Sequence, residues 1–301
     1  MQSIINYIRN PKAILSSLTV KFYWLFSDAT YLKIRYYLYF GKRLDLKNPQ
    51  TFSEKLQWLK LYNRRPEYTT MVDKYAVKDY VKSIIGEEYI IPTLGVWDRP
   101  EDIDFDSLPD KFVLKTTHGG GGGGVVICKN KAKLEKQETF SQLNQSLKND
   151  IYKKLKEWPY KNVRKRIIAE VYLEDENFAV IRDYKFYCFS GKVEYLMIAN
   201  GRFSNAKTFD YFDRYFNRLP FAQGSKTSDL VIEKPKAFDK MLECAEKLSV
   251  GIPHVRVDLY NIDGKIYFGE LTFFDASGFE PFEPEEWDLK FGKLIKLPNK
   301  N

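Results

Sequence analysis

The sequence predicts an α+β fold built from helices and antiparallel hairpins. Apolar residues recur at helical spacing near the N-terminus, and from Ile90 onward the pattern changes to short strand-like runs. Several neighbouring runs are joined by tight turns, such as Ser190-Gly191 and Asp263-Gly264, which favour antiparallel pairing. Strands and helices do not alternate regularly along the chain, so the pattern excludes a doubly wound parallel sheet.

The first part of the chain, residues 1–70, predicts a helical region. Apolar positions recur at helical spacing over residues 31–40 and again over residues 52–59. A further helix is expected over residues 73–84, and Gly86 ends it.

The remainder of the chain is expected to be mostly strands. Helices are predicted over residues 131–155 and 236–248, and the polar and aromatic segment 200–223 carries no clear pattern. The predicted strand-like runs are residues 90–92, 94–97, 112–115, 125–128, 167–173, 183–189, 192–198, 255–260 and 265–271.

The composition is typical of a folded protein with a large core. Of the 301 residues, 44% are hydrophobic and 16% are aromatic, which excludes a disordered chain. The formal net charge of +8 suits an acidic partner, such as a nucleotide, an acidic polysaccharide, an anionic lipid or a nucleic acid. Because the lysines are spread along the chain, a solvated basic surface is the simpler explanation of this charge.

The cysteines predict neither a disulfide framework nor a zinc site. Cys128, Cys188 and Cys244 are widely spaced, and the chain has only two histidines to join them. Cys128 and Cys188 lie in apolar runs, where a cysteine is usually a small core residue. This usage fits a reducing cytoplasm.

The most apolar stretch near the N-terminus, residues 13–39, is interrupted by charged residues. It predicts no membrane span, and the apolar core and cleavage site of a signal peptide are not found. The stretch is nevertheless rich in aromatic and basic residues. One interpretation is an amphipathic segment on a membrane surface; packing onto the main body is the favoured one.

A run of glycines between two predicted strands is the most informative local feature. Each glycine costs roughly 0.5–1 kcal/mol relative to alanine in an ordered element, so such a run needs a compensating reason. A turn without side chains lets backbone N–H groups converge on phosphate oxygens, and it can move as a lid. The alternative is a flexible hairpin tip or linker. The run follows Lys115 and His118 and consists of Gly119, Gly120, Gly121, Gly122, Gly123 and Gly124.

Neither of the two ordinary nucleotide-binding motifs fits this glycine run. No Gly-Lys-Ser/Thr follows it, which excludes a P-loop, and the next element is a strand rather than a helix, which excludes a dinucleotide fingerprint. A strand-loop-strand cover over phosphates remains, with Lys115 just upstream.

The last predicted hairpin offers a metal site. Arg256 and Asp258 share one face of its first strand, and Glu270 and Thr272 share one face of its second. The turn brings the two acids within a few residues of being opposite. Two neighbouring carboxylates repel unless a cation joins them, and with phosphate oxygens and water they suit Mg²⁺. The alternative is an ordinary charged hairpin in which Arg256 pairs with Asp258 or Glu270.

Further candidates lie between the glycine run and this hairpin. Glu170 ends an apolar strand, where an acid could accept from an adenine amino group or a ribose hydroxyl. Asp183 and Lys185 share a face of the next strand, and Lys185 could meet phosphates. Taken singly, each of these side chains is also explained as an exposed charge.

Several separate stretches follow one another in a characteristic order between about Thr30 and Pro298. They are Asn48–Lys55, Val72–Val77, Phe112–Lys115, Asp183–Phe186, Arg256–Asp258 and Gly278–Phe282. Together they resemble the TupA-like ATP-grasp family of cell-surface polysaccharide loci. The resemblance implies an ATP-grasp fold, in which two α+β subdomains clasp ATP. Residues 1–70 would form a helical N-terminal region, 71–165 the subdomain with the glycine-rich lid, and 166–301 the subdomain with the metal site.

The resemblance also implies a role for the nucleotide-binding candidates. Lys115 and Lys185 would hold phosphates of ATP, and Glu170 would lie at the adenine hinge. The glycine loop would cover the β- and γ-phosphates. We expect His118 and Asp183 to be among the nucleotide contacts.

For the metal and the chemistry, the resemblance implies a second set of roles. Asp258 and Glu270 would bind Mg²⁺, and Thr272 stands where ATP-grasp enzymes usually have an asparagine ligand. Arg256 would hold the acceptor carboxylate or stabilise an acylphosphate, with Lys185 as the second catalytic residue.

The implied activity is ATP-dependent carboxylate–amine ligation through an acylphosphate, with ATP and Mg²⁺ as cofactors. The resemblance implies a uronic acid-type carboxylate in a surface or capsular polysaccharide precursor and an amino acid or other amine. No nucleic-acid partner is expected. A cytoplasmic location is expected, with contact of the N-terminal segment with the inner face of the membrane left open.

Two alternatives to ligation stay open from the sequence. A glycosyltransferase would use the Asp-x-Asp motif Asp104-Phe105-Asp106, which falls in an expected loop. A non-catalytic nucleotide or polysaccharide binder would lack the metal acids, and both acids are present.

Overall fold

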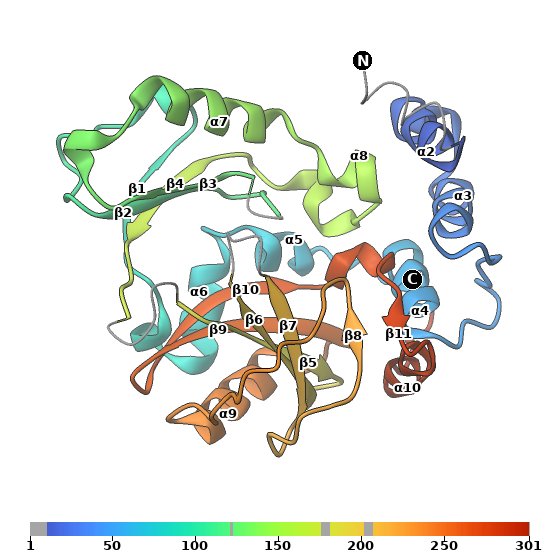
Figure 1. The fold of residues 1–301 in the computed structure, drawn as a ribbon. Coiled ribbons are helices and arrows are strands. Elements are labelled where there is room, and N and C mark those ends of the chain that lie inside the picture. Colours follow the sequence, from blue (N-terminus) through green and yellow to red (C-terminus); the bar gives the residue numbers. More distant parts are fainter. Residues whose placement is uncertain (1–10, 121–122, 176–180, 202–206, 301) are drawn as a thin grey trace.

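Two antiparallel sheets lie one above the other in the computed structural model, which describes residues 11–120, 123–175, 181–201 and 207–300 (Figure 1). The smaller sheet, sheet A, has the strand order β1-β4-β2-β3, and the larger, sheet B, has the order β10-β9-β5-β6-β7. Sheet A comprises β1 (Thr93–Trp97), β2 (Phe112–Thr116), β3 (Val125–Cys128) and β4 (Ile167–Val171). Sheet B comprises β5 (Asp183–Phe189), β6 (Lys192–Asn200), β7 (Thr208–Asp213), β9 (His254–Ile262) and β10 (Lys265–Thr272).

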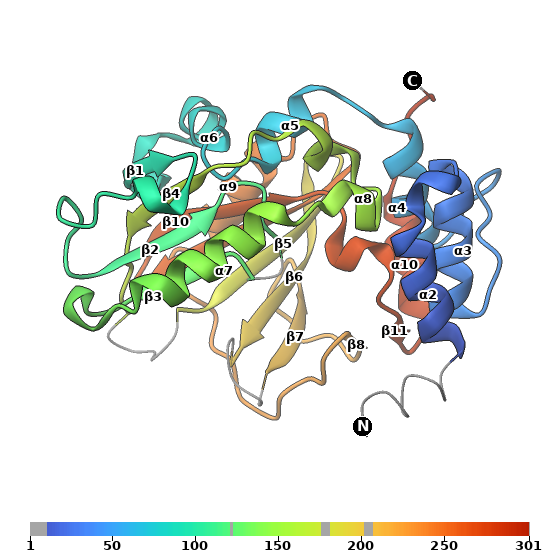
Figure 2. The same cartoon turned by 90° about the horizontal axis from the view of Figure 1, so that it is seen from above.

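Helices cover the outer faces of both sheets and close one end of the molecule. Helix α7 (Lys136–Lys148) lies over sheet A, and α9 (Phe238–Leu248) lies under sheet B (Figures 1 and 2). The other helices are α2 (Pro11–Lys21), α3 (Asp28–Phe40), α4 (Phe52–Tyr62), α5 (Glu67–Val72), α6 (Val77–Ile85), α8 (Ile151–Leu155) and α10 (Glu286–Leu294). Two short strands, β8 (Ala222–Gln223) and β11 (Phe282–Glu283), pair with each other, and the short 3₁₀ helices are η1 (Tyr23–Leu25), η2 (Glu87–Tyr89), η3 (Pro100–Asp102), η4 (Lys131–Lys133), η5 (Trp158–Asn162) and η6 (Asp275–Gly278).

The two sheets have separate apolar cores of very different size. The core of sheet A is a small cluster in which Phe112, Leu114 and Leu143 of α7 are fully buried. The core of sheet B is much larger, and it includes residues of α3, α4, α5, α6, α9 and α10. Sheet B is therefore supported by a large, well-packed core, and its inner face is turned toward the inner face of sheet A.

The sequence pattern explains why helix α4 anchors the N-terminal region. Thr51 and Glu54 form a capping box, in which the Thr51 hydroxyl accepts from the Glu54 N–H and the Glu54 carboxylate accepts from the Thr51 N–H. Phe52, Leu56 and Leu59 are buried, as their helical spacing predicts.

The largest differences from the expected elements concern α6, the helix expected over 131–155, and the segment 200–223. Helix α6 begins at Val77 and not at residue 73, because the Asp73 carboxylate accepts the backbone N–H groups of Tyr75 and Ala76 in a turn. The helix expected over 131–155 is divided into η4, α7 and α8. The segment 200–223, for which no element was predicted, contributes β7 and β8.

The strand β4 also lies beyond the expected subdomain boundary at residue 165. It pairs with β1 and β2, so sheet A includes residues from both expected subdomains. The pairing of distant strands depends on sheet order, which the pattern within each strand does not specify.

Cys128 and Cys188 are buried, as their apolar surroundings in the sequence predict, and Cys244 is buried as well. In the described part of the chain, no helix has the length and apolarity needed to cross a membrane.

The close packing of α10 on the start of α4 yields a test of the fold. A Cβ on Gly292 would lie 2.2 Å from the Gln50 carbonyl oxygen and 2.6 Å from the Thr51 carbonyl carbon. Both are backbone atoms, which can move away only at a substantial cost in free energy. We expect Gly292→Ala to lower the free energy of unfolding by about 2 kcal/mol in urea titrations. Gly123→Ala, where a Cβ would meet no described atom within 4 Å, is the matched control; an equal loss in both variants would contradict this packing.

Candidate active site

A cleft of about 740 Å³ lies between the two sheets. Sheet A and its glycine loop contribute one wall, and the inner face of sheet B contributes the other. Of the residues predicted as site residues, those that line the cleft are Gly119, Gly120, Gly124, Asp183, Lys185, Arg256, Glu270 and Thr272.

A β-bulge at Gly269 brings the two predicted metal acids directly opposite each other. Phe268 pairs with Leu259, but after the bulge Glu270 pairs with Asp258. Without the extra residue, Glu270 would fall opposite Val257 and point to the other face of the sheet. Glycine suits this position, because a Cβ on Gly269 would lie 3.0 Å from the Asp258 carbonyl oxygen.

Arg256 is the centre of the ion-pair network on sheet B. Its Nε and Nη2 donate to the two carboxylate oxygens of Asp258 at 2.7 and 2.8 Å. Its Nη1 donates to Asp275 of η6, and its Nη2 also donates to the Thr272 hydroxyl at 3.2 Å. The Tyr187 hydroxyl donates to the other Asp275 oxygen at 2.6 Å, so the guanidinium is fixed from both sides.

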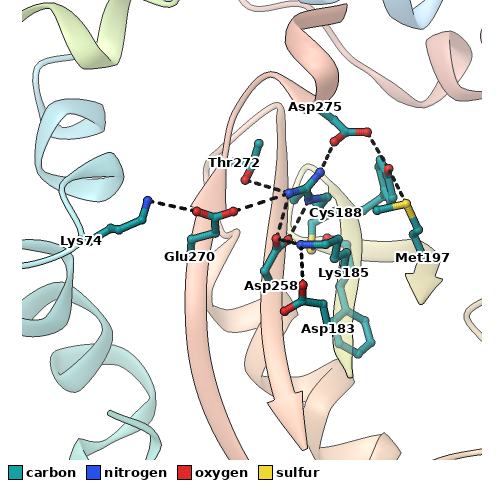
Figure 3. Close-up of polar contacts among 12 residues, drawn as sticks. Lys74, Asp183, Lys185, Cys188, Met197, Asp258, Glu270, Thr272 and Asp275 are labelled. Atoms are coloured by element: carbon teal, nitrogen blue, oxygen red, sulfur yellow. Dashed lines mark hydrogen bonds and ion pairs between the residues drawn. The ribbon is translucent and has the colours of Figure 1, made fainter. Parts of the chain in front are cut away.

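Two lysines complete the network around the acids (Figure 3). Lys185 of β5 forms an ion pair with Asp258, and its Nζ lies 3.7 Å from an Asp183 oxygen. Lys74, which precedes α6, donates to Glu270 at 3.2 Å and to the Gly119 carbonyl oxygen at 2.6 Å. Lys74 therefore joins the glycine loop to the acids of sheet B across the cleft.

The pKa values of the two facing acids shift in opposite directions. Burial raises the pKa of Glu270, but Lys74, Lys185 and Arg256 outweigh that effect and hold this pKa below its usual range. Burial raises the pKa of Asp258 despite its ion pairs, and the charge of Glu270 acts in the same direction. A divalent cation between the two acids would relieve this repulsion.

The first and last glycines of the loop are needed for close packing. A Cβ on Gly119 would lie 2.5 Å from the Thr116 hydroxyl oxygen, and a Cβ on Gly124 would lie 2.2 Å from the Ser146 hydroxyl oxygen. The Thr116 N–H donates to the Gly124 carbonyl oxygen at 3.0 Å and closes the base of the loop. The predictions for Gly121 and Gly122 fall outside the described residues.

Lys115 and Glu170 form a second charged cluster beside the cleft. The Glu170 carboxylate is buried and accepts from Lys115 at 2.5 Å and from Lys78 of α6 at 2.6 Å. A gap of about 10 Å³ borders these three residues and Lys74. Both Glu170 oxygens meet lysines, so its predicted contact with adenine or ribose stays a prediction.

His118 is buried behind the loop and does not line the cleft. Burial lowers the pKa of its imidazole, and the positive charge of Lys165 acts in the same direction. Asp183, by contrast, is buried at the start of β5 and reaches the cleft wall.

Sequence reasoning did not assign roles to Lys74, Lys78 or Asp275. The stretch Val72–Val77, quoted above for the family resemblance, contains Lys74 and was the available signal for it. No local pattern marks Lys78 or Asp275, because each acquires its role from a partner on a distant element.

The donor set of Asp258 and Glu270 fits Mg²⁺ as a partner of phosphate. In the described residues, no three His, Cys, Asp or Glu side chains are grouped so as to hold a metal by themselves. Two carboxylates suffice for Mg²⁺ where phosphate oxygens and water complete its shell. The alternative contact is also present, since Arg256 pairs with Asp258 and lies 3.8 Å from Glu270. Metal binding would therefore require Asp258 to lose some of its ion-pair contacts with Lys185 and Arg256.

Comparison with known proteins gives a family match over most of the chain. The sequence profile of the family described as TupA-like ATPgrasp matches residues 54–296, which confirms the resemblance inferred from the motifs. The match and the paired antiparallel sheets together confirm the expected α+β ATP-grasp fold. A search of curated proteins found no match.

The solved structures that are similar to this chain include several ligases. D-alanine–D-alanine ligase from Bacillus anthracis, in complex with ATP, is 17% identical with a TM-score of 0.40, over 68% of this chain and 54% of that one. The corresponding ligase from Helicobacter pylori is 14% identical with a TM-score of 0.45, over 82% and 69%. The D-cycloserine synthetase DcsG is 16% identical with a TM-score of 0.41, over 75% and 69%. The chain thus spans about half the length of the Bacillus anthracis ligase.

The buried cluster of Glu170 with two lysines yields a prediction with a defined pH dependence. Burial raises the pKa of Glu170, but Lys115 and Lys78 outweigh it and hold the pKa below its usual value. The stabilisation is therefore complete above the unfolded pKa of about 4.3 and is lost as pH falls through the lower folded pKa. We expect Glu170→Gln to cost roughly 3 kcal/mol at pH 7 and progressively less below pH 4, measured by urea unfolding.

Glu174→Gln is the control for this experiment, because the Lys111–Glu174 pair is exposed and should contribute less than about 1 kcal/mol. A Glu170→Gln penalty that stays constant between pH 7 and pH 3 would contradict the assigned ion pairs.

Proposed function

The chain belongs to the TupA-like ATP-grasp family, and on this premise we propose that it is an ATP-dependent carboxylate–amine ligase. The observation that carries the proposal is the pair of facing acids, Asp258 and Glu270, surrounded by Lys74, Lys185 and Arg256 and linked through Lys74 to the glycine loop. Glu270, Lys74, Lys185 and Arg256 line the cleft, and the buried Asp258 adjoins it through its ion pairs with Lys185 and Arg256.

In this proposal the nucleotide phosphates lie between the glycine loop and sheet B. The loop offers backbone N–H groups without side chains, and Lys74 and Lys185 supply positive charge from two sides. Lys115 lies in the neighbouring cluster. It would supply a further positive charge when its ion pair with Glu170 is broken. Asp258 and Glu270 would hold Mg²⁺, which neutralises charge on the transferred phosphoryl group.

The reaction requires activation of a poor acyl donor. A carboxylate attacks the γ-phosphorus of ATP, which gives an acylphosphate and ADP. An amine then attacks the acyl carbon, loses a proton, and expels phosphate to leave an amide. The protein positions the reactants and neutralises charge, and Arg256 is placed to bind the acceptor carboxylate or the acylphosphate.

The acceptor in this proposal is a uronic acid-type carboxylate of a surface or capsular polysaccharide precursor, and the co-substrate is an amino acid or other amine. Aromatic side chains support a bulky acceptor, since Tyr39 and Phe279 line the cleft and stack with ring centroids 4.9 Å apart. The reaction would take place in the cytoplasm, where ATP is held, at the inner face of the membrane.

The glycosyltransferase alternative receives less support from its own motif. The Asp104 carboxylate accepts the backbone N–H groups of Asp106 and Ser107 in a turn, and Phe105 between the acids is buried. Neither acid lines the cleft. An Asp-x-Asp motif used for a metal would have both carboxylates facing a substrate site.

A direct assay distinguishes the three candidate activities. The purified protein is incubated with Mg²⁺, ATP, UDP-sugars, uronic acids and a panel of amines, and products are followed by phosphate release and mass spectrometry. We expect ADP and phosphate to form only when a carboxylate and an amine are both present. UDP release without ATP consumption would contradict ligation, and tight ATP binding without turnover would indicate a binder.

The metal assignment predicts the outcome of one conservative substitution. Glu270→Gln removes a charge but keeps the shape, and it should lower kcat at least about 100-fold because charge on the phosphoryl group is no longer neutralised. Its melting temperature should change little, because the side chain is 36% exposed. Asp263→Asn, in the exposed turn of the same hairpin, is the control. Unchanged turnover in Glu270→Gln would contradict the metal role.

A further inference from the structure

The helix α2 and the turn η1 present an apolar surface to solvent. The two elements lie with α3 at one end of the molecule in both views (Figures 1 and 2). Three exposed apolar residues share one side of α2 by helical spacing, and three more follow directly in the turn and η1 at its C-terminal end. We call these residues together the α2 face, and it consists of Ile14, Leu15, Leu18, Phe22, Trp24 and Leu25, exposed by 36%, 50%, 45%, 36%, 61% and 68%.

Helix α2 has both apolar and polar contacts with the rest of the protein, but its leucines take no part in the core. Val20 packs, partly buried, against the main core, and so do Tyr23 and Phe26 just after the helix. The Ser16 hydroxyl accepts from Arg35 of α3, and the buried Thr19 hydroxyl donates to the Leu15 carbonyl oxygen at 2.7 Å. These contacts hold α2 in place and leave Leu15 and Leu18 exposed, where they can meet a separate partner.

The charge around the α2 face has one sign. Lys12 and Lys21 are exposed on α2, and the first acidic residue along the chain is Asp28. Asp28 is itself paired with Arg64 and Lys156. An apolar stripe with lysines and an exposed tryptophan, and without acids, has the composition of a helix that lies in the headgroup region of an anionic bilayer.

A second copy of the chain is a poorer occupant for this face. A stable protein interface engages roughly 20–30 residues on each side, and one stripe of a short helix and a turn offers far fewer. Two copies would also bring the lysines of both α2 helices together. A bilayer has neither constraint, because it accepts a narrow apolar stripe and attracts the lysines.

We propose that the α2 face docks this protein onto an anionic lipid bilayer, with its apolar side chains inserted among the headgroups and Lys12 and Lys21 at the phosphate level. Tyr39 of the adjoining helix α3 lines the cleft, so docking would hold that side of the cleft near the lipid surface. The docking surface does not use any residue assigned to ATP or metal, and it stands independently of the proposed ligation.

The test is sedimentation of the purified full chain with vesicles of phosphatidylcholine alone or with about one third phosphatidylglycerol. We expect binding to the anionic vesicles that weakens at least tenfold in Leu18→Ser/Leu25→Ser. Lys12→Gln and Lys21→Gln should each weaken it about fivefold. Leu230→Ser is the matched control, because Leu230 is exposed by 56% outside α2 and η1, and it should bind like the unaltered protein.

Trp24 supplies a second measurement that does not depend on comparing variant stabilities. Its fluorescence should shift to the blue when anionic vesicles are added, and this shift should be absent in Trp24→Phe. Equal sedimentation of the double variant and the unaltered protein, or no blue shift, would overturn the proposal. A dimer in lipid-free solution that the double variant converts to a monomer would also overturn it, in favour of a second copy.

Discussion

The buried guanidinium of Arg256 is the interaction on which the arrangement of the site depends. It binds Asp258 of its own strand, Asp275 of η6 and Thr272 of the neighbouring strand, and it lies within ion-pair distance of Glu270. Removal of this charge would leave several acids close together in a region largely excluded from water, where repulsion is strong. The position of η6 and the spacing of the acids therefore follow from one cation.

The two walls of the cleft rest on apolar cores of very different size. Sheet B rests on the large core and carries the Arg256 network, whereas sheet A has only a small core under α7. The described part of the glycine loop is joined to sheet B by the Lys74 contact to Gly119. Sheet B, with its large core, fixes the charges, and sheet A, with its small core, carries the glycine loop. This combination suits a site that must admit and then enclose a nucleotide.

The charged-hairpin interpretation and the metal-site interpretation of β9 and β10 are compatible. The acids are paired with Lys74, Lys185 and Arg256, which keeps buried carboxylates compensated. The same lysines and arginine carry the charge that phosphates require. When a nucleotide binds with its metal, the acids would exchange these cations for the metal, and the cations would exchange the acids for phosphates. The number of unpaired charges in the cleft would therefore change little.

The sequence by itself determined the class of fold, most of the elements, the position of the glycine loop, and which side chains share a face of a strand. These features depend on periodicity and on backbone freedom, which are properties of neighbouring residues. Alternation along a strand put Arg256 and Asp258 on one face of β9, and Glu270 and Thr272 on one face of β10.

Only the tertiary structure decided how these parts meet. The bulge at Gly269 sets Glu270 opposite Asp258, β4 joins sheet A across the expected boundary, and Lys74 reaches a partner 196 residues away. The stretch 13–39 packs onto the main body through α3, as the sequence favoured, and the structure adds that one side of α2 stays exposed. Register, sheet order and long-range ion pairs arise from competition among distant segments, which no local pattern records.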